Sequence, residues 1–259
     1  MKSKFRLSCM AMLAAATMSG SFSSCSSEDD DIMSEYPPEE KPEVPHYDNL
    51  SYMPGANVQL INKAEYCKSI IADGKELIVT GNESGELIVP ELKDPKVYIT
   101  FKEGITVFSD VFLGCTKLTS VPANLFANHP NATSFSGAFL RCTALTAIPE
   151  DLFANNQAAE NFAWLFYNCR KLESIPEKLF ANCPAVTDFS SSFAACKRLV
   201  SIPSALFAHN PNVTDFSYAF SDCSFITSIP ASLFDNNRKI EVFSGLFSNC
   251  TSLKGESPY

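Results

Sequence analysis

The chain of 259 residues contains few of the side chains on which enzymes and metalloproteins depend. It has three histidines, His46, His129 and His209, and no serine or cysteine lies in a nucleophile-elbow context. Its cysteines form no C-x-x-C pair, which a zinc site would need. The carboxylates are scattered along the chain, so no pair for acid–base catalysis is evident. The sequence therefore predicts a protein that is not an enzyme, with no catalytic residue, metal site or cofactor.

Positive charge is also scarce. Twenty Lys and Arg residues stand against 29 Asp and Glu residues, which gives a formal net charge of −9. Nucleic acids and anionic lipid surfaces would repel such a protein at long range, so neither is expected as a partner. The apolar run Met10–Met18 is too short to span a bilayer as a helix.

The N-terminus has the pattern of an export signal. Lys2, Lys4 and Arg6 precede the apolar run, and residues 22–25, Phe-Ser-Ser-Cys, resemble a relaxed lipobox. We therefore expect a lipoprotein signal peptide over residues 1–24 and lipidation of Cys25. The alternative is a plain secretory signal that leaves Cys25 free.

An acidic segment follows the cysteine at residues 26–31. It resembles the surface-export signal of lipoproteins in gut and oral anaerobes, and it is also compatible with a solvated linker. We expect a protein anchored by lipid in the outer membrane, facing the cell exterior, with no other membrane contact. Residues 25–54 are acidic and rich in proline, which predicts a semi-rigid tether.

The dominant pattern of the chain is a repeat of 27 residues. Phenylalanines and prolines keep the same spacing as one series of cysteines, and no insertion breaks the phase. A constant period of this length indicates stacked coils that bury their apolar faces against one another. The cysteines that define the period are Cys115, Cys142, Cys169, Cys196, Cys223 and Cys250.

We predict a leucine-rich-repeat-like solenoid of mixed short parallel β-strands and short helical turns over residues 105–259. Segments such as Leu199–Ile202 and Val213–Phe216 are the expected strands. A serine such as Ser190 is expected to cap one turn, and a proline such as Pro203 to begin the other.

Residues 55–104 do not follow the period. Alternating apolar residues predict three strands here, at 76–80, 86–89 and 97–101, with the first two joined as a hairpin. This segment is expected to form a small β-rich N-terminal cap on the repeats.

One coil reads V-T-x-F-S-x-x-F-x-x-C-x-x-L-x-S-I-P-x-x-L-F-x-N, and Val213–Asn236 follows it closely. This motif resembles the repeat of the BspA-like leucine-rich repeat family, over residues 105–253. The chain departs from that family in a serine that replaces a common glycine and in a Pro-x-x-Leu-Phe turn. The resemblance implies a cell-surface protein without enzymatic activity that adheres to host matrix proteins, surfaces or partner cells.

The repeated cysteines are expected to be reduced and buried, because in-register parallel side chains rarely reach disulfide geometry. Cys67 and Cys183 lie outside this series and have no assigned role.

One position of the repeat varies in size and polarity, which is typical of an exposed site. It holds Trp164, the only tryptophan, and Tyr218 two coils later, and Tyr167 lies three residues after Trp164. We predict that Trp164, Tyr167 and Tyr218 bind a ligand. The alternative is that Trp164 packs on a neighbouring coil. The members of this position are Asp110, Gly137, Trp164, Ser191, Tyr218 and Gly245.

We therefore predict a non-catalytic leucine-rich-repeat binding module at the cell surface, serving adhesion or protein–protein interaction. Two alternatives stay open: a surface glycan-binding protein of a polysaccharide uptake system, and a structural component of the envelope. The expected partner is a host or bacterial surface protein, or a glycan.

Overall fold

The computed structural model describes residues 49–254. Cys25, His46, the expected signal peptide and all of the expected tether before residue 49 lie outside these residues. None of the helices among residues 49–254 is long and apolar enough to cross a membrane.

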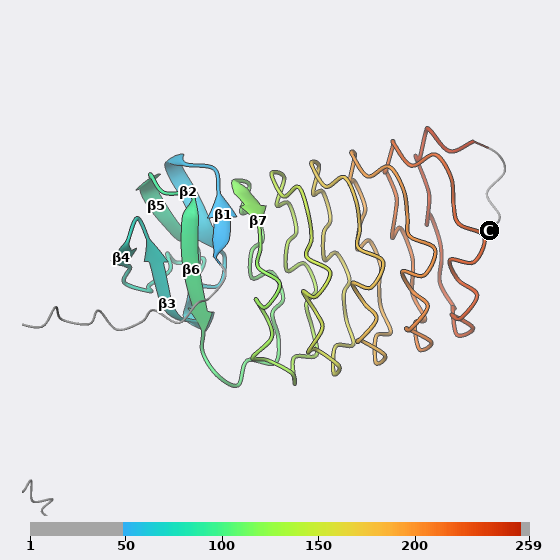
Figure 1. The fold of residues 1–259 in the computed structure, drawn as a ribbon, viewed down its shortest axis with the longest axis horizontal. Helices are drawn as coiled ribbons and strands as arrows, with labels where there is room; N and C mark the ends of the chain where they lie inside the picture. Colours follow the sequence, from blue (N-terminus) through green and yellow to red (C-terminus); the bar gives the residue numbers. More distant parts are fainter. Residues whose placement is uncertain (1–48, 255–259) are drawn as a thin grey trace, which may run out of the picture. The chain divides into compact units, whose positions relative to one another are not determined.

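Two antiparallel sheets form the first part of the described chain (Figure 1). One sheet has the order β4-β3-β6-β1-β7, and the other pairs β2 with β5. β1 falls inside the segment that we expected to be a tether. The strands are β1 (Leu50–Tyr52), β2 (Gly55–Ile61), β3 (Cys67–Ala72), β4 (Lys75–Glu76), β5 (Leu87–Leu92), β6 (Lys96–Phe101) and β7 (Leu118–Ser120), and the 3-10 helix η1 (Ala64–Tyr66) precedes β3.

Period-two burial explains why β6 is a strand. Val97, Ile99 and Phe101 are buried, while the residues between them are more exposed. β6 pairs with β3, where Ile70 lies opposite Ile99. These apolar side chains form the N-terminal part of a continuous core.

The predicted hairpin of residues 76–80 and 86–89 is wrong. Strand structure ends at Glu76, and Ile78 is among the most exposed apolar residues. β5 pairs with β2, and β4 pairs with β3. The alternating pattern indicated extended chain but carried no information about which strand would pair with which.

The predicted fold class is also wrong. Among residues 49–254 the only helix is η1, every paired strand is antiparallel, and the repeats contain neither short parallel strands nor helical turns. Neighbouring coils share single parallel bridges. These bridges join Val107 to Ser134, Ser134 to Asn161, Asn161 to Asp188, Asp188 to Asp215, and Asp215 to Val242.

Backbone conformation explains this outcome. Each coil has two residues with positive φ, four positions apart, for example Trp164 and Asn168 at 59° and 61°. A left-handed residue can continue neither a strand nor a right-handed helix. The segment therefore folds as successive turns, in which Ala138 N–H donates to Phe135 O (3.0 Å) and Leu140 N–H donates to Gly137 O (2.9 Å).

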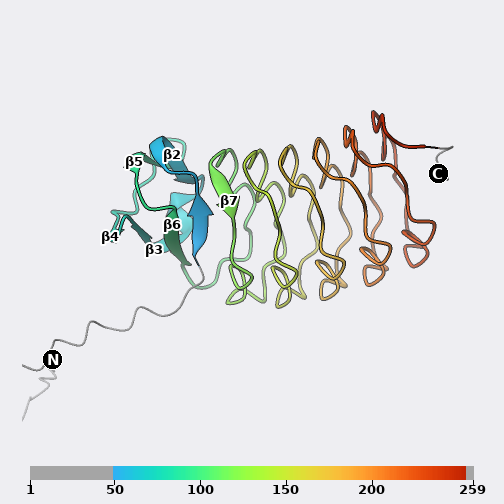
Figure 2. The same cartoon turned by 45° about the horizontal axis from the view of Figure 1, so that its top comes forward.

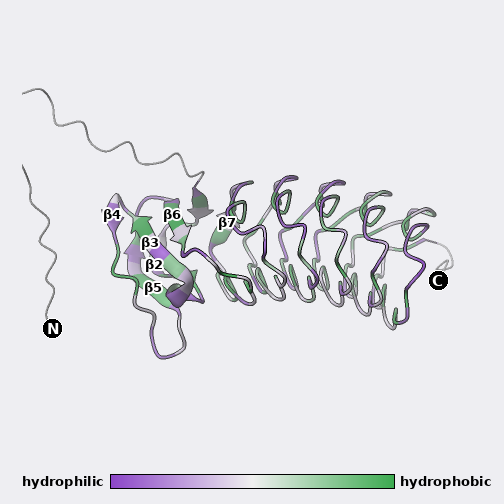
Figure 3. Cartoon of the chain, turned by 90° about the horizontal axis from the view of Figure 1, so that it is seen from below, coloured by the Kyte–Doolittle hydropathy of each residue, from purple (hydrophilic) through white to green (hydrophobic). Residues whose placement is uncertain are grey.

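The coils still lie side by side, because alternate N–H groups of one coil donate to carbonyls of the next (Figures 1 and 2). Phe135 N–H donates to Asn161 O (2.9 Å), and Gly137 N–H donates to Ala163 O (2.8 Å). We call this arrangement of residues 105–254 the coil stack. Each coil contains both polar and apolar segments (Figure 3), and the apolar side chains meet inside. Equivalent rings stack there, with Phe112 and Phe139 at 5.4 Å between centroids.

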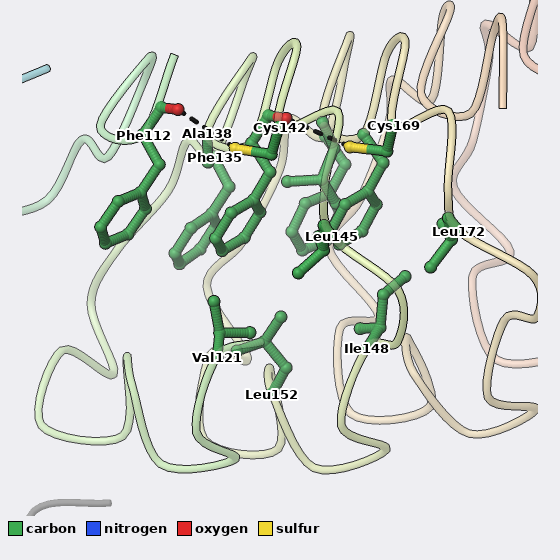
Figure 4. Close-up of a cluster of buried hydrophobic side chains, with 14 of the residues drawn as sticks. Phe112, Val121, Phe135, Ala138, Cys142, Leu145, Ile148, Leu152, Cys169 and Leu172 are labelled. Atoms are coloured by element: carbon green, nitrogen blue, oxygen red, sulfur yellow. Dashed lines mark hydrogen bonds between the residues drawn. The ribbon is translucent and has the colours of Figure 1, made fainter. Parts of the chain in front are cut away.

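The repeated cysteines point into this core (Figure 4). Cys142 Sγ donates to Phe112 O (3.2 Å), and Cys169 Sγ donates to Phe139 O (3.3 Å). All eight cysteines of the described chain are buried and unpaired, which confirms the prediction of reduced, buried thiols.

A second inward-facing series of residues keeps the same 27-residue spacing and was not predicted. Asn210 Nδ2 donates to Phe180 O (3.1 Å) and to Cys183 O (2.8 Å), and thus links two coils. Cys183, which had no assigned role, occupies this position in its own coil and donates to Phe153 O at 3.7 Å. We call this series the amide ladder. Its members are His129, Asn156, Cys183, Asn210 and Asn237.

The N-terminal sheets take the place of a coil before the first one. In later coils, carbonyls of the segment that holds the positive-φ residues accept hydrogen bonds from N–H groups of the preceding coil. In the first coil the donors come from the N-terminal part instead: Asn62 N–H donates to Val111 O (2.9 Å), and Gln59 Nε2 donates to Leu113 O (2.9 Å). Phe101 of β6 stacks on Phe126 at 6.1 Å and 14°. The sheets thereby satisfy the first coil's acceptors and extend its row of rings.

Candidate ligand-binding site

The variable position of the repeat is left-handed in every coil. Its φ values run from 54° at Ser191 to 65° at Gly245, with Trp164 at 59° and Tyr218 at 55°. A residue other than glycine pays roughly 1–2 kcal/mol for this conformation. Trp164 and Tyr167 lie in one turn, which is closed by Tyr167 N–H donating to Trp164 O (3.1 Å).

Large and small residues alternate along this position. A Cβ added to Gly245 would lie 2.4 Å from Tyr218 Cε1, and one added to Gly137 would lie 2.3 Å from Asp110 Oδ1. The Tyr218 ring and the Asp110 carboxylate therefore lie directly over the glycines of the following coils. Ser191, which follows Trp164 in the series, is only 5% exposed. The small residues make room for the large side chains that precede them.

The structure brings two of the three predicted residues together. The rings of Trp164 and Tyr167 lie 5.0 Å apart at 49°, and Tyr167 is half-buried. Trp164 is 44% exposed, so neighbouring coils do not enclose it, and Tyr218 is 50% exposed two coils further along. We call Trp164, Tyr167 and Tyr218 the aromatic face. Whether it binds a ligand stays a prediction.

The second left-handed position, four residues after the first, holds a polar side chain in four of six coils: Arg141, Asn168, Asp222 and Asn249. Arg170 Nε donates to Asn168 Oδ1 (2.8 Å), and Asn249 Nδ2 donates to Asp222 Oδ1 (3.1 Å). These groups add hydrogen-bonding capacity close in sequence to the aromatic residues. An exposed aromatic centre with a polar surround has the composition of a binding surface.

The buried thiols are poor nucleophiles. Burial raises the pKa of Cys142 and Cys169 well above the ordinary thiol value, and it raises the pKa of Cys67 and Cys183 to about 12. They stay protonated near neutral pH, and only the thiolate attacks or binds a metal. Residues 49–254 contain no group of three or more His, Cys, Asp and Glu side chains that could hold a metal ion.

The histidines are separated in the structure. His129 is buried in the first coil, whereas His209 is exposed on a later turn. His129 belongs to the amide ladder, and its recurrence at the spacing of Asn156 was the available signal.

No protein-family model matches this chain, and the search of characterised proteins finds no significantly similar sequence. The resemblance to the BspA-like family therefore stays a prediction that rests on the repeat motif.

Proposed function

We propose that this chain is a non-catalytic binding module that holds a protein partner on its aromatic face. The observation that carries the proposal is the exposure of Trp164 and Tyr218 in a left-handed backbone conformation. Because about half of each side chain is exposed, its burial contributes little free energy to offset the cost of the left-handed backbone conformation. Strained, exposed residues of this kind concentrate at functional sites.

Residue chemistry favours a protein partner. Trp and Tyr are the residues most enriched among those that dominate binding energy at protein interfaces. Trp164 and Tyr167 supply rigid aromatic area, and the amide of Asn168 beside them can pair with polar groups of a partner. This combination supports adhesion to a host or bacterial surface protein, the role that the repeat motif also suggests.

A glycan is the second candidate. Trp164 and Tyr218 stand two coils apart, a separation of roughly 10 Å at the spacing of hydrogen-bonded chains. Two neighbouring sugar rings can bridge that distance and stack on both aromatic rings. In that case the chain would act in polysaccharide uptake. A structural role in the envelope would require neither ring to bind anything.

We further propose that the protein is anchored in the outer membrane by lipid on Cys25 and faces the exterior. The lipobox-like residues 22–25 and the acidic segment 26–31 support this location. Changing Cys25 to Ser is expected to release the protein from the membrane fraction of cells that produce it. Membrane retention of the variant, measured by fractionation and immunoblotting, would contradict the proposal.

The binding function is tested by the double variant Trp164→Ala/Tyr218→Ala on an array of matrix proteins and glycans. Losing two aromatic anchors should weaken binding by more than ~1 kcal/mol, with little change in Tm. Phe225→Ala is the matched control, because Phe225 is an aromatic residue of the coil stack that is 58% exposed outside the aromatic face. Unchanged affinity of the double variant would remove the site, and a marked fall in Tm would show that the rings serve packing.

A further inference from the structure

A cleft of about 320 Å³ lies between β6 and the first Pro-x-x-Leu-Phe turn of the coil stack. Thr100 and Phe101 of β6 and Asn124, Leu125 and His129 of the first coil line this cleft. The volume falls within the range of small-molecule sites. The cleft is distinct from the aromatic face and does not depend on the function proposed for it.

The cleft forms beside His129 because β6, and not another coil, precedes the first coil. In later coils the amide-ladder residue donates to carbonyls of the preceding coil, as Asn156 Nδ2 does to His129 O (2.8 Å). The first coil follows β6 instead. Phe101 of β6 supplies a ring for the core, and the His129 ring meets it edge-on at 6.0 Å.

The His129 imidazole therefore makes no hydrogen bond to a preceding coil among the described residues, whereas the equivalent side chains of the amide ladder do. The residue is 7% exposed and lines the cleft, and its ring nitrogens have no hydrogen-bond partner within residues 49–254. Burial lowers the pKa of His129, which keeps the ring neutral near pH 7. A neutral imidazole offers one donor and one acceptor.

Other polar side chains around the cleft are equally available. None of them makes a side-chain hydrogen bond or ion pair to another of the described residues. Phe101 and Leu125 provide an apolar floor between them. These polar side chains are Lys68, Thr100, Glu103, Asn124 and Asn128.

We propose that this cleft binds a neutral pyranose sugar. Carboxamides, a hydroxyl and a neutral imidazole each donate and accept hydrogen bonds, as sugar hydroxyls do. Lys68 and Glu103 carry opposite charges, so the lining has no net charge that would select an ion. The apolar floor matches the C–H face of a sugar ring, and the volume accommodates one or two rings.

The test follows the imidazole resonances of the full chain, labelled at histidine, by NMR. The chain has only three histidines, and glucose, galactose, mannose and N-acetylglucosamine are titrated separately. We expect a saturable shift of the His129 resonances with at least one sugar and none for His209. Absence of a saturable shift with all four sugars would overturn the proposal. Glycine is titrated in parallel, and a saturable shift with glycine but with none of the sugars would overturn the proposal and assign the cleft to a zwitterion.

Variants separate binding from folding. Asn124→Ala/Asn128→Ala should weaken sugar binding by about tenfold or more, because two hydrogen-bonding groups are lost. Asn155→Ala is the matched control, since Asn155 is the exposed equivalent of Asn128 in the next coil. His129→Asn places the usual ladder residue at this site and should keep the fold. Unchanged sugar affinity in the Asn124→Ala/Asn128→Ala variant would contradict the assignment.

Discussion

At the scale of single residues, the buried thiols link the stability of the protein to pH. Burial raises the pKa of every described cysteine above the ordinary value of 9.0, and the pKa of Cys67 and Cys183 reaches about 12. In the unfolded chain these thiols ionise near pH 9, whereas in the folded chain they stay protonated. The unfolded chain then binds fewer protons, so the free energy of unfolding falls as the pH rises above 9.

We predict that the urea midpoint decreases between pH 9 and pH 12 and is little affected by these groups below pH 9. Circular dichroism across a pH series measures this change. Cys183→Asn removes one thiol and introduces the residue found at the same ladder position in Asn156 and Asn210. The variant should fold and show a shallower decrease above pH 9. An identical pH slope in the two proteins would contradict the linkage.

Residue patterns predicted the core better than they predicted the site. The 27-residue spacing alone placed Phe139 and Cys142 in the interior, where both are fully buried. The same spacing placed Trp164 and Tyr218 at an exposed position. It could not show their left-handed conformation, because Trp and Tyr do not favour positive φ. Gly137 and Gly245 at the same position indicate a left-handed conformation, because glycine adopts positive φ readily. We used them only as evidence that the residue type varies at this position.

At the scale of the turn, the side-chain oxygen that caps three of the coils comes two residues earlier than we predicted. Asp188 Oδ1 accepts from Ser190 N–H and Asp215 Oδ1 accepts from Ser217 N–H, both at 2.7 Å. Asn161 Oδ1 makes the equivalent bond to Ala163 N–H at 2.8 Å. The serine hydroxyls were expected to cap these turns, but the side chains at the bridge position do so.

We therefore predict that Asp188→Ala lowers the free energy of unfolding by about 1 kcal/mol, the typical loss for a capping oxygen. Asp188→Asn should lose less, because its amide oxygen can still accept. Ser190→Ala is the control and should be close to neutral. Urea unfolding of the three variants measures the differences. A larger loss from Ser190→Ala than from Asp188→Ala would restore the serine as the cap.

Strand pairing marks the limit of what the sequence could predict. Apolar alternation correctly indicated extended chain at 97–101, which lies in β6, and at 86–89, which overlaps β5. β6 pairs with β3 and β1, and β5 pairs with β2. Alternation is interrupted in the segment that forms β3, Cys67–Ala72, where Ile70 and Ile71 are adjacent. In the repeats, the Val-Thr-x-Phe segments resemble strands in composition, but left-handed residues two positions after the phenylalanine interrupt them. Propensity cannot show that interruption.

At the scale of the whole molecule, each coil contacts its neighbours through equivalent hydrogen bonds and stacked rings. Deleting residues 186–212 removes one full period and joins Ala185 to Val213, the equivalent of Val186. We predict a folded protein with a lower Tm, because one coil–coil interface is lost while the register is kept. Thermal melting followed by circular dichroism measures the effect.

The matched control deletes residues 186–198, about half a period. The coil at the junction would then lack half of its residues and could not match the coils on both sides, so this variant should have a lower Tm than the full-period deletion. Equal behaviour of the two deletions, folded or unfolded, would contradict the dependence on register.

In the segment of each coil that holds the left-handed residues, main-chain N–H groups donate to the next coil, as Phe216 N–H does to Val242 O (2.8 Å). Just before this segment the direction is reversed, since Thr214 N–H donates to Thr187 O of the preceding coil (2.9 Å). At the first coil, Asn62 N–H and Gln59 Nε2 donate to the carbonyls of the left-handed segment. At the other end, no residue among 49–254 accepts from the N–H groups of the last described coil, which are those of Phe243, Gly245, Phe247 and Asn249. The same coil also presents an acceptor: no N–H among residues 49–254 donates to Glu241 O, whereas its equivalent Thr214 O accepts from Glu241 N–H (2.8 Å). A backbone that continues this array must therefore offer carbonyls to the left-handed segment and an N–H group to Glu241 O.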